Sequence, residues 1–126
     1  MTENNKVVII DDNKDITMVL SDILEIGGYD VVAIGYNGEE ALLLYKKHNP
    51  DFILLDVMMP VMDGIQALEK IKKEYSDANV IMITANNGTD TIQKLEKLKA
   101  AAIITKPFKI ETVFETMKKV SNKITK

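Results

Sequence analysis

Five short apolar runs, each followed by a longer amphipathic stretch, constrain the fold of this chain more than any other feature. The runs begin near residues 7, 30, 52, 80 and 101, and each contains at least four consecutive apolar residues. A strand that is apolar on both faces is buried on both faces, which is typical of a parallel sheet. Between the runs, apolar residues recur at helical spacing. The first such stripe comprises Ile16, Val19, Leu20, Ile23 and Leu24.

Strict alternation of strand and helix predicts right-handed βαβ units in one doubly wound α/β domain. Its length of 126 residues suits a single domain. We therefore expect one domain over residues 1–126, with a core of about 6–124, five parallel strands and five helices. Asn37 and Asp63 are predicted N-caps of the second and third helices, and Gly27-Gly28 is predicted to end the first.

Composition excludes several classes of function. The chain has no cysteine, so disulfides and thiol chemistry are excluded. It has no apolar run near the roughly 20 residues of a membrane span, and its polar N-terminus does not resemble a signal peptide. These features predict a cytoplasmic protein with no membrane association.

Charge is unevenly distributed along the chain. Residues 1–90 hold 7 Lys and 16 Asp or Glu, a balance of −9, whereas residues 91–126 hold 9 Lys and 3 Glu, a balance of +6. The basic third is either a set of solvated helix faces or a docking surface for an acidic protein partner. Nucleic acid is a less favoured partner, because every basic residue is Lys and none is Arg.

Polar side chains follow four of the five predicted strands. Asp11 and Asp12 follow the first strand, Asp56 the third, Thr84 the fourth and Lys106 the fifth. Ligands of open parallel sheets bind beyond the carboxyl ends of the strands, so these side chains should share one edge. The second strand ends without a comparable group, which favours the strand order 2-1-3-4-5 and a crevice between strands one and three.

This set of groups suits metal-assisted phosphoryl chemistry. Oxygen ligands favour a hard cation such as Mg²⁺, and a carboxylate can act as a nucleophile. Asp56 is the candidate nucleophile, Asp11 and Asp12 are candidate metal ligands, and Thr84 and Lys106 can stabilise negative charge. Taken singly, each carboxylate or hydroxyl could be a turn or helix cap, and Lys106 a surface lysine.

The sequence resembles the receiver domains of two-component response regulators over essentially its whole length. The resemblance rests on an acidic motif, an aspartate-proline-glycine block, a strand ending in Thr-Ala and a Lys-Pro-Phe motif. These are residues 8–13 (VIIDDN), 52–64 (FILLDVMMPVMDG), 80–85 (VIMITA) and 106–108 (KPF). The resemblance implies a flavodoxin-like fold and a signalling switch that catalyses only its own phosphorylation and dephosphorylation.

The resemblance also implies a role for each matching residue. Asp56 would accept a phosphoryl group from the histidine of a sensor kinase or phosphotransfer protein, or from a small acyl-phosphate donor. Mg²⁺ would be bound by Asp12, Asp56 and the Met58 carbonyl directly, and by Asp11 mostly through water. Lys106, the Thr84 hydroxyl and the amides of Val57 and Ala85 would bind phosphoryl oxygens. The Lys106–Pro107 bond would be cis.

The switch implied by the resemblance couples Thr84 and residue 103 to a surface made of the fourth helix, fifth strand and fifth helix. Here Ile103 replaces the usual aromatic residue, so a different coupling is expected. Lys99 replaces a glycine that the family favours, which predicts a differently shaped turn. Met58 and Asn86 occupy positions that bear on phosphate lifetime.

Two other functions are compatible with parts of this sequence. One is a receiver-like scaffold that signals by docking alone, which Ile103 favours and the complete acidic set opposes. The other is an aspartyl-phosphate hydrolase of a different α/β family. That class needs a second aspartate two residues after the nucleophile, where this chain has Met58.

Overall fold

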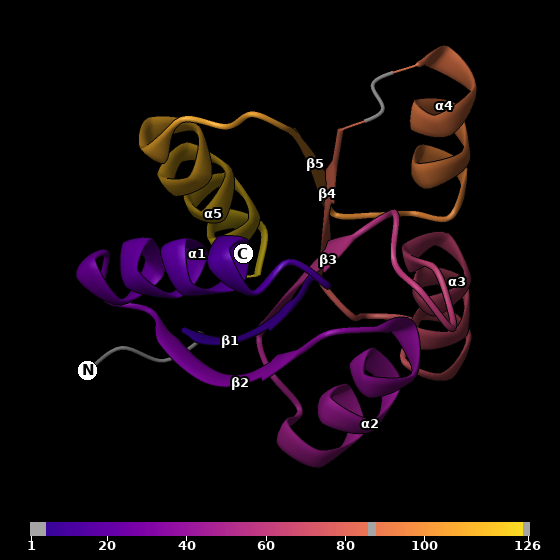
Figure 1. The fold of residues 1–126 in the computed structure, drawn as a ribbon, viewed down its shortest axis with the longest axis horizontal. Helices are drawn as coiled ribbons and strands as arrows, with labels where there is room; N and C mark the ends of the chain where they lie inside the picture. The colour runs from indigo at the N-terminus through magenta and orange to yellow at the C-terminus, as the bar shows by residue number, and fades with distance from the viewer. Residues whose placement is uncertain (1–4, 86–87, 125–126) are drawn as a thin grey trace.

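The computed structural model describes residues 5–85 and 88–124, which form five strands and five helices in strict alternation (Figure 1). In chain order they are β1 (Lys6–Ile10), α1 (Lys14–Ile26), β2 (Asp30–Gly35), α2 (Gly38–His48), β3 (Phe52–Asp56), α3 (Gly64–Glu74), β4 (Val80–Thr84), α4 (Thr89–Lys97), β5 (Ala102–Thr105) and α5 (Ile110–Ile124).

All five strands are parallel and lie in the order β2-β1-β3-β4-β5, so the predicted fold class and strand order are confirmed. The chain crosses from the β2 side to the β3 side after α2. The polar ends of β1 and β3 therefore lie beside each other. Strand pairing continues to the carboxyl ends of β3, β4 and β5, where Asp56 is aligned with Ile83 and Thr84 with Thr105.

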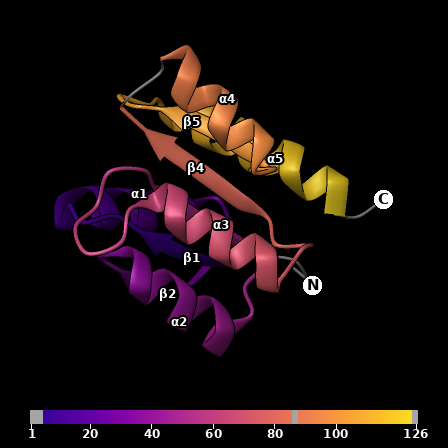
Figure 2. The ribbon, with the colours of Figure 1, turned by 90° about the vertical axis from the view of Figure 1, so that its right-hand side faces the viewer.

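Two apolar layers cover the sheet. Helices α1 and α5 lie on one face, and α2, α3 and α4 lie on the other (Figures 1 and 2). Alternate residues of one strand serve different layers: Val7 and Ile9 pack toward α1 and α5, whereas Val8 and Ile10 pack toward α2 and α3. Strands β3 and β4 are buried throughout, which explains their uninterrupted apolar sequences.

The predicted helix starts are confirmed by cap geometry. The Asn37 side chain accepts a hydrogen bond from the Glu40 amide at 2.9 Å. Asp63 and Gln66 form a reciprocal capping box at the start of α3. At the other end of α1, Gly27 is the C-cap and Gly28 has a φ of 92°.

The buried face of α1 differs from the prediction. Val19 is 51% exposed, whereas Thr17 is buried beside Leu20 and Leu24. Successive residues turn by roughly 100°, so Thr17, Leu20 and Leu24 share a face from which Val19 is displaced. The Thr17 hydroxyl is buried without loss of a hydrogen bond, because it donates to the Lys14 carbonyl at 2.8 Å.

Lys99, between α4 and β5, was expected to reshape its turn but adopts the conformation that glycine favours. Its φ is 66°, in the left-handed region. The Lys99 and Ala100 amides donate to the carbonyls of Glu96 and Leu95, which ends α4 in a compact turn. The turn is retained, and the lysine backbone is strained as a result.

Candidate phosphoryl and metal site

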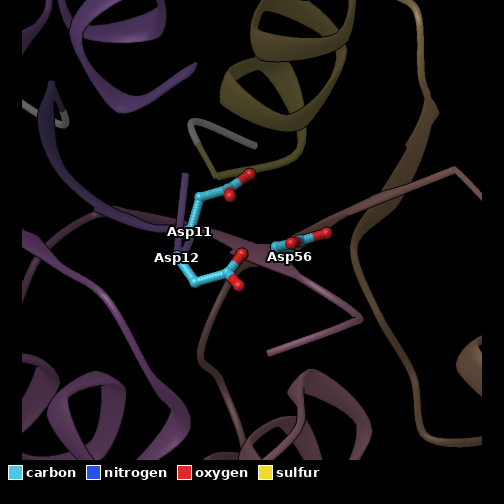
Figure 3. A group of neighbouring side chains, drawn as sticks. All are labelled: Asp11, Asp12 and Asp56. Carbon is cyan, nitrogen blue, oxygen red and sulfur yellow. The ribbon is translucent and has the colours of Figure 1, made fainter. Parts of the chain in front are cut away.

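Three carboxylates meet at the carboxyl edge of the sheet. Asp11 and Asp12 follow β1 and Asp56 ends β3, and one oxygen from each lies within 4.8 Å of the other two (Figure 3). The neighbouring positions of β1 and β3 in the sheet produce this convergence. The structure thus brings together the three residues that the sequence selected as metal ligands.

The three carboxylates differ in burial. Asp11 is 1% exposed and Asp56 is 5% exposed, whereas Asp12 lies exposed at the rim. Asp11 is fixed by local hydrogen bonds: its Oδ1 accepts from the Asn13 amide at 2.9 Å, and its own amide donates to the Gly35 carbonyl. Asp12 is therefore the carboxylate most open to solvent and to an incoming ion.

Lys106 lies against the two buried carboxylates. Its Nζ is 3.0 Å from Asp11 Oδ2 and 3.4 Å from Asp56 Oδ1. The backbone around it is anchored, since the Lys106 amide donates to the Thr84 carbonyl at 2.8 Å, and the Lys106–Pro107 bond is cis as expected. Burial alone would lower the pKa of Lys106, but the hydrogen bond to Asp11 and the charge of Asp56 outweigh it and raise the pKa.

Burial also dominates at Asp56 and raises the pKa of its carboxyl to about 6. The neighbouring charge of Asp11 raises the pKa further, Lys106 opposes both effects, and Asp12 adds a smaller increase. A carboxyl of this kind is mostly ionised at neutral pH, although its charged form is disfavoured by the site. A cation or a transferable group at Asp56 would relieve that cost.

The other predicted phosphoryl-binding groups border the same edge. Thr84 is fully buried at the end of β4, and Ala85, next along the chain, is exposed. The Val57 amide donates to the Ile83 carbonyl at 3.1 Å, so it is engaged within the sheet. It could bind a phosphoryl oxygen only by sharing or leaving that bond.

Three positions were linked to phosphate lifetime or to switching by the resemblance alone: Met58, Asn86 and Ile103. The Met58 side chain is 68% exposed beside Asp56. Asn86 lies outside the described residues. Ile103 is half-buried and packs against the core layer under α2, α3 and α4, so it faces the interior.

Two glycines hold the loop after Asp56: Gly64, to which the resemblance assigns a role in shaping this loop, and Gly38, which the sequence patterns did not single out. A Cβ on Gly64 would lie 2.0 Å from the Asp56 carbonyl oxygen, and one on Gly38 would lie 2.3 Å from that of Met62. The Gly64 amide donates to the Val57 carbonyl, and the Gly38 amide to the Met62 carbonyl. Gly38 directly follows the N-cap residue Asn37 and begins α2. A glycine at this first helical position was the sequence signal for a close backbone contact.

The donor set fits Mg²⁺. Every side chain that converges offers oxygen, and Mg²⁺ is typically held by one or two carboxylates together with water and phosphate oxygens. Asp12 and Asp56 could bind such an ion directly, and Asp11, tied to Lys106, is better placed to act through water. The arrangement could hold a divalent cation and an anionic group at the same time.

Fold and site together define a class: a doubly wound α/β domain with an acidic pocket and a lysine at the carboxyl edge of its sheet. A model of the response regulator receiver domain matches residues 7–118. The chain therefore belongs to the response regulator receiver domain family, whose members are signalling switches.

Individual relatives agree with this assignment. The chain is 36% identical over 118 residues to the chemotaxis protein CheY of Bacillus subtilis, covering 94% of this chain and 98% of that protein. It is 35% identical over 116 residues to sporulation initiation phosphotransferase F of the same organism, covering 92% and 93%. The CheX–CheY–BeF3–Mg²⁺ complex from Borrelia burgdorferi contains a similar chain, with a TM-score of 0.89, 32% identity and coverage of 91% and 87%.

Across residues 5–85 and 88–124, no helix combines the length and the apolar character that crossing a bilayer requires.

Proposed function

We propose that this domain accepts a phosphoryl group on Asp56 and thereby switches a protein-binding surface. One observation carries the proposal: the carboxylates of Asp11, Asp12 and Asp56 converge at one edge of the sheet, and the ammonium group of Lys106 contacts two of them, Asp11 and Asp56. The donor would be the phosphohistidine of a sensor kinase or phosphotransfer protein, or a small acyl phosphate. The relatives support this reading, since one is a phosphotransferase by name and another was crystallised with BeF3 and Mg²⁺.

The transfer is a displacement at phosphorus. An Asp56 carboxylate oxygen forms the new O–P bond as the bond to the donor's nitrogen or carboxylate oxygen breaks, and the donor leaves with that electron pair. Bound Mg²⁺ would neutralise charge on the transferring oxygens. Asp12 and Asp56, with the Met58 carbonyl, would hold the ion, and Asp11 would position water on it.

Lys106 is the residue whose contacts would change most. In this structure its ammonium group contacts Asp11 and Asp56. A phosphoryl group on Asp56 offers more negative charge and several acceptor oxygens, so Lys106 would pair with it. The Thr84 hydroxyl and the Val57 and Ala85 amides would bind the remaining oxygens, with Val57 sharing or leaving its bond to Ile83.

The switched surface would consist of α4, β5 and α5, which lie next to this edge (Figure 2). Thr84 ends β4 and is aligned with Thr105 of β5. Movement of Thr84 toward a phosphoryl group would therefore shift the paired residues of β5. Ile103, on the same strand, would change its packing under α4. The partner would be an acidic protein, because residues 91–126 carry the excess of lysine.

Intact mass spectrometry tests the proposal. Incubation with acetyl phosphate and Mg²⁺ should add about 80 Da, the mass of one phosphoryl group. Asp56→Asn and omission of Mg²⁺ should each abolish the addition, whereas Asp22→Asn, an exposed carboxylate on α1, should leave it unchanged. An unmodified wild-type mass under these conditions would favour the alternative of a scaffold that signals by docking alone.

A further inference from the structure

A second concave site lies at the opposite, amino edge of the sheet. It is a cavity of about 440 Å³ where the C-terminal ends of α2 and α3 meet the segments that precede β3 and β4. Helices α2 and α3, whose C-terminal ends line the cavity, pack side by side (Figures 1 and 2). Five residue steps along β3 separate Asp51 in this cavity from Asp56, roughly 16 Å along the strand.

Tyr45 is a buried residue whose hydroxyl forms no hydrogen bond with the described part of the protein and opens to the cavity. The residue is 6% exposed, and its ring lies 4.9 Å from that of Tyr75. Among the described residues, none forms a hydrogen bond with its hydroxyl. Every fully enclosed side-chain oxygen and nitrogen in that part of the chain has a partner, so the Tyr45 hydroxyl must reach the cavity that the residue lines. A buried phenol group normally finds a partner.

The cavity wall is acidic, and its carboxylates have no ion-pair partner among the described residues. Asp51, Glu74 and Asp77 line it, no lysine does, and in the described ranges none of these carboxylates forms an ion pair. Lys72 donates to the carbonyls of Ser76 at 2.6 Å and Ala78 at 3.1 Å, so its ammonium group is bound to backbone beside the cavity. Asp51 Oδ2 accepts from the Lys6 amide at 2.9 Å, which leaves its other carboxylate oxygen for a ligand. Burial, then Tyr75, Asp51 and Asp77, raises the pKa of Tyr45, as expected for a hydroxyl that faces this negative wall.

The spacing of the carboxylates disfavours a single metal ion. Within residues 5–85 and 88–124, only Asp11, Asp12 and Asp56 bring three carboxylate ligand atoms together. The carboxylates of Asp51, Glu74 and Asp77 line the second cavity without forming such a group. A ligand that matches them must carry separated positive charges joined by apolar segments, which is the chemistry of an aliphatic polyamine.

We propose that this cavity binds an aliphatic polyamine, with its ammonium groups at Asp51, Glu74 and Asp77, one of them donating to the Tyr45 hydroxyl, and its methylene chain along Tyr75. The site does not depend on phosphorylation at Asp56. It would make the domain responsive to a small cationic molecule through α2 and α3.

Titration of the full chain with spermidine, followed by calorimetry and by backbone amide NMR, tests the proposal. Saturating Mg²⁺ is present to occupy the acidic pocket at the other edge. The expected result is saturable binding with chemical-shift changes confined to residues 45, 49–51 and 74–79. Tyr45→Phe should weaken binding about tenfold, because it removes one charge-assisted hydrogen bond, and Asp77→Asn about threefold.

Asp22→Asn is the matched control, since it removes an exposed carboxylate from α1 on the other face of the sheet and should leave the affinity unchanged. Asp77 is itself exposed, so its variant should fold even if Tyr45→Phe does not. The proposal is overturned by absence of saturable binding, by shift changes centred on Asp12 and Asp56, or by equal loss of affinity in Asp77→Asn and Asp22→Asn.

Discussion

The two edges of the sheet differ in how closely their carboxylates are grouped. At the carboxyl edge, one oxygen from each of Asp11, Asp12 and Asp56 lies within 4.8 Å of the other two, and one lysine contacts Asp11 and Asp56. At the amino edge, Asp51, Glu74 and Asp77 are spread around a cavity with no lysine in its wall. Close grouping of carboxylates raises the electrostatic cost of ionising them, whereas wider separation keeps this cost low. The first arrangement suits a compact ion and a transferable anion, and the second suits an extended cation.

The largest effect on stability is expected where backbone segments approach most closely. Gly64→Ala places a Cβ 2.0 Å from the Asp56 carbonyl oxygen, so the loop below the acidic pocket must move. We expect a loss of about 3 kcal/mol or more in urea unfolding. The control is Gly28→Ala at the amino edge, where the Cβ meets no atom within 4 Å and the positive φ alone should cost about 1 kcal/mol. Equal losses would show that the carboxyl edge is not tightly packed.

Measuring stability as a function of pH should reveal the raised pKa of Asp56. Its pKa is about 6 in the fold against 3.8 for the ordinary group, so the folded state binds the proton more tightly than the unfolded state. This contribution to stability is complete below about pH 4 and is lost as pH rises through 6. In chelator, the stability of Asp56→Asn relative to wild type should rise by about 2 to 3 kcal/mol between pH 4 and 7.5. A constant difference across that range would contradict the raised pKa.

Removal of one charge should distinguish crowded from spread carboxylates. Without metal, Asp12→Asn should raise the stability by about 1 kcal/mol, because two like charges about 5 Å apart repel even near the surface. Asp77→Asn should change it by less than about 0.5 kcal/mol. Repulsion alone predicts the same gain for Asp11→Asn, but Asp11 also accepts from the Asn13 amide and pairs with Lys106. Thermal melts that show a loss for Asp12→Asn would contradict the account of a crowded pocket.

The smallest effect concerns backbone strain at the amino edge. Lys99 holds a φ of 66° in the turn before β5. Lys99→Gly should stabilise the domain by about 0.5 kcal/mol, since relief of the strain exceeds the added freedom of the unfolded chain. The control is Lys94→Gly inside α4, at an exposed position, which should destabilise by about 1 kcal/mol. A loss of stability in Lys99→Gly similar to that control would show that the turn carries no strain.

The sequence predicted the fold and the convergence of Asp11, Asp12, Asp56 and Lys106 because both follow from strand order. Once the strands are parallel, the residues at their carboxyl ends must share an edge. Exposure of Val19 was not predictable in the same way, because the rotation of α1 about its axis is set by packing. The bond from the Val57 amide to the Ile83 carbonyl also depended on tertiary contacts.

The amino-edge cavity could not be found from sequence. Tyr45 lies on α2 and Tyr75 directly follows α3, while Asp51 and Asp77 lie in segments whose sequences are typical of ordinary turns. Nothing local marks these residues as neighbours. Lys99 was identified as a departure from the family pattern, but only the backbone shows that the left-handed turn is kept.

Magnesium titration of the metal-free protein, followed by calorimetry, tests most directly whether the crowded edge is a cation site. The account predicts saturable binding to wild type, at least tenfold weaker binding to Asp12→Asn, and unchanged binding to Asp77→Asn. Undetectable binding at millimolar Mg²⁺, or equal weakening in both variants, would contradict it.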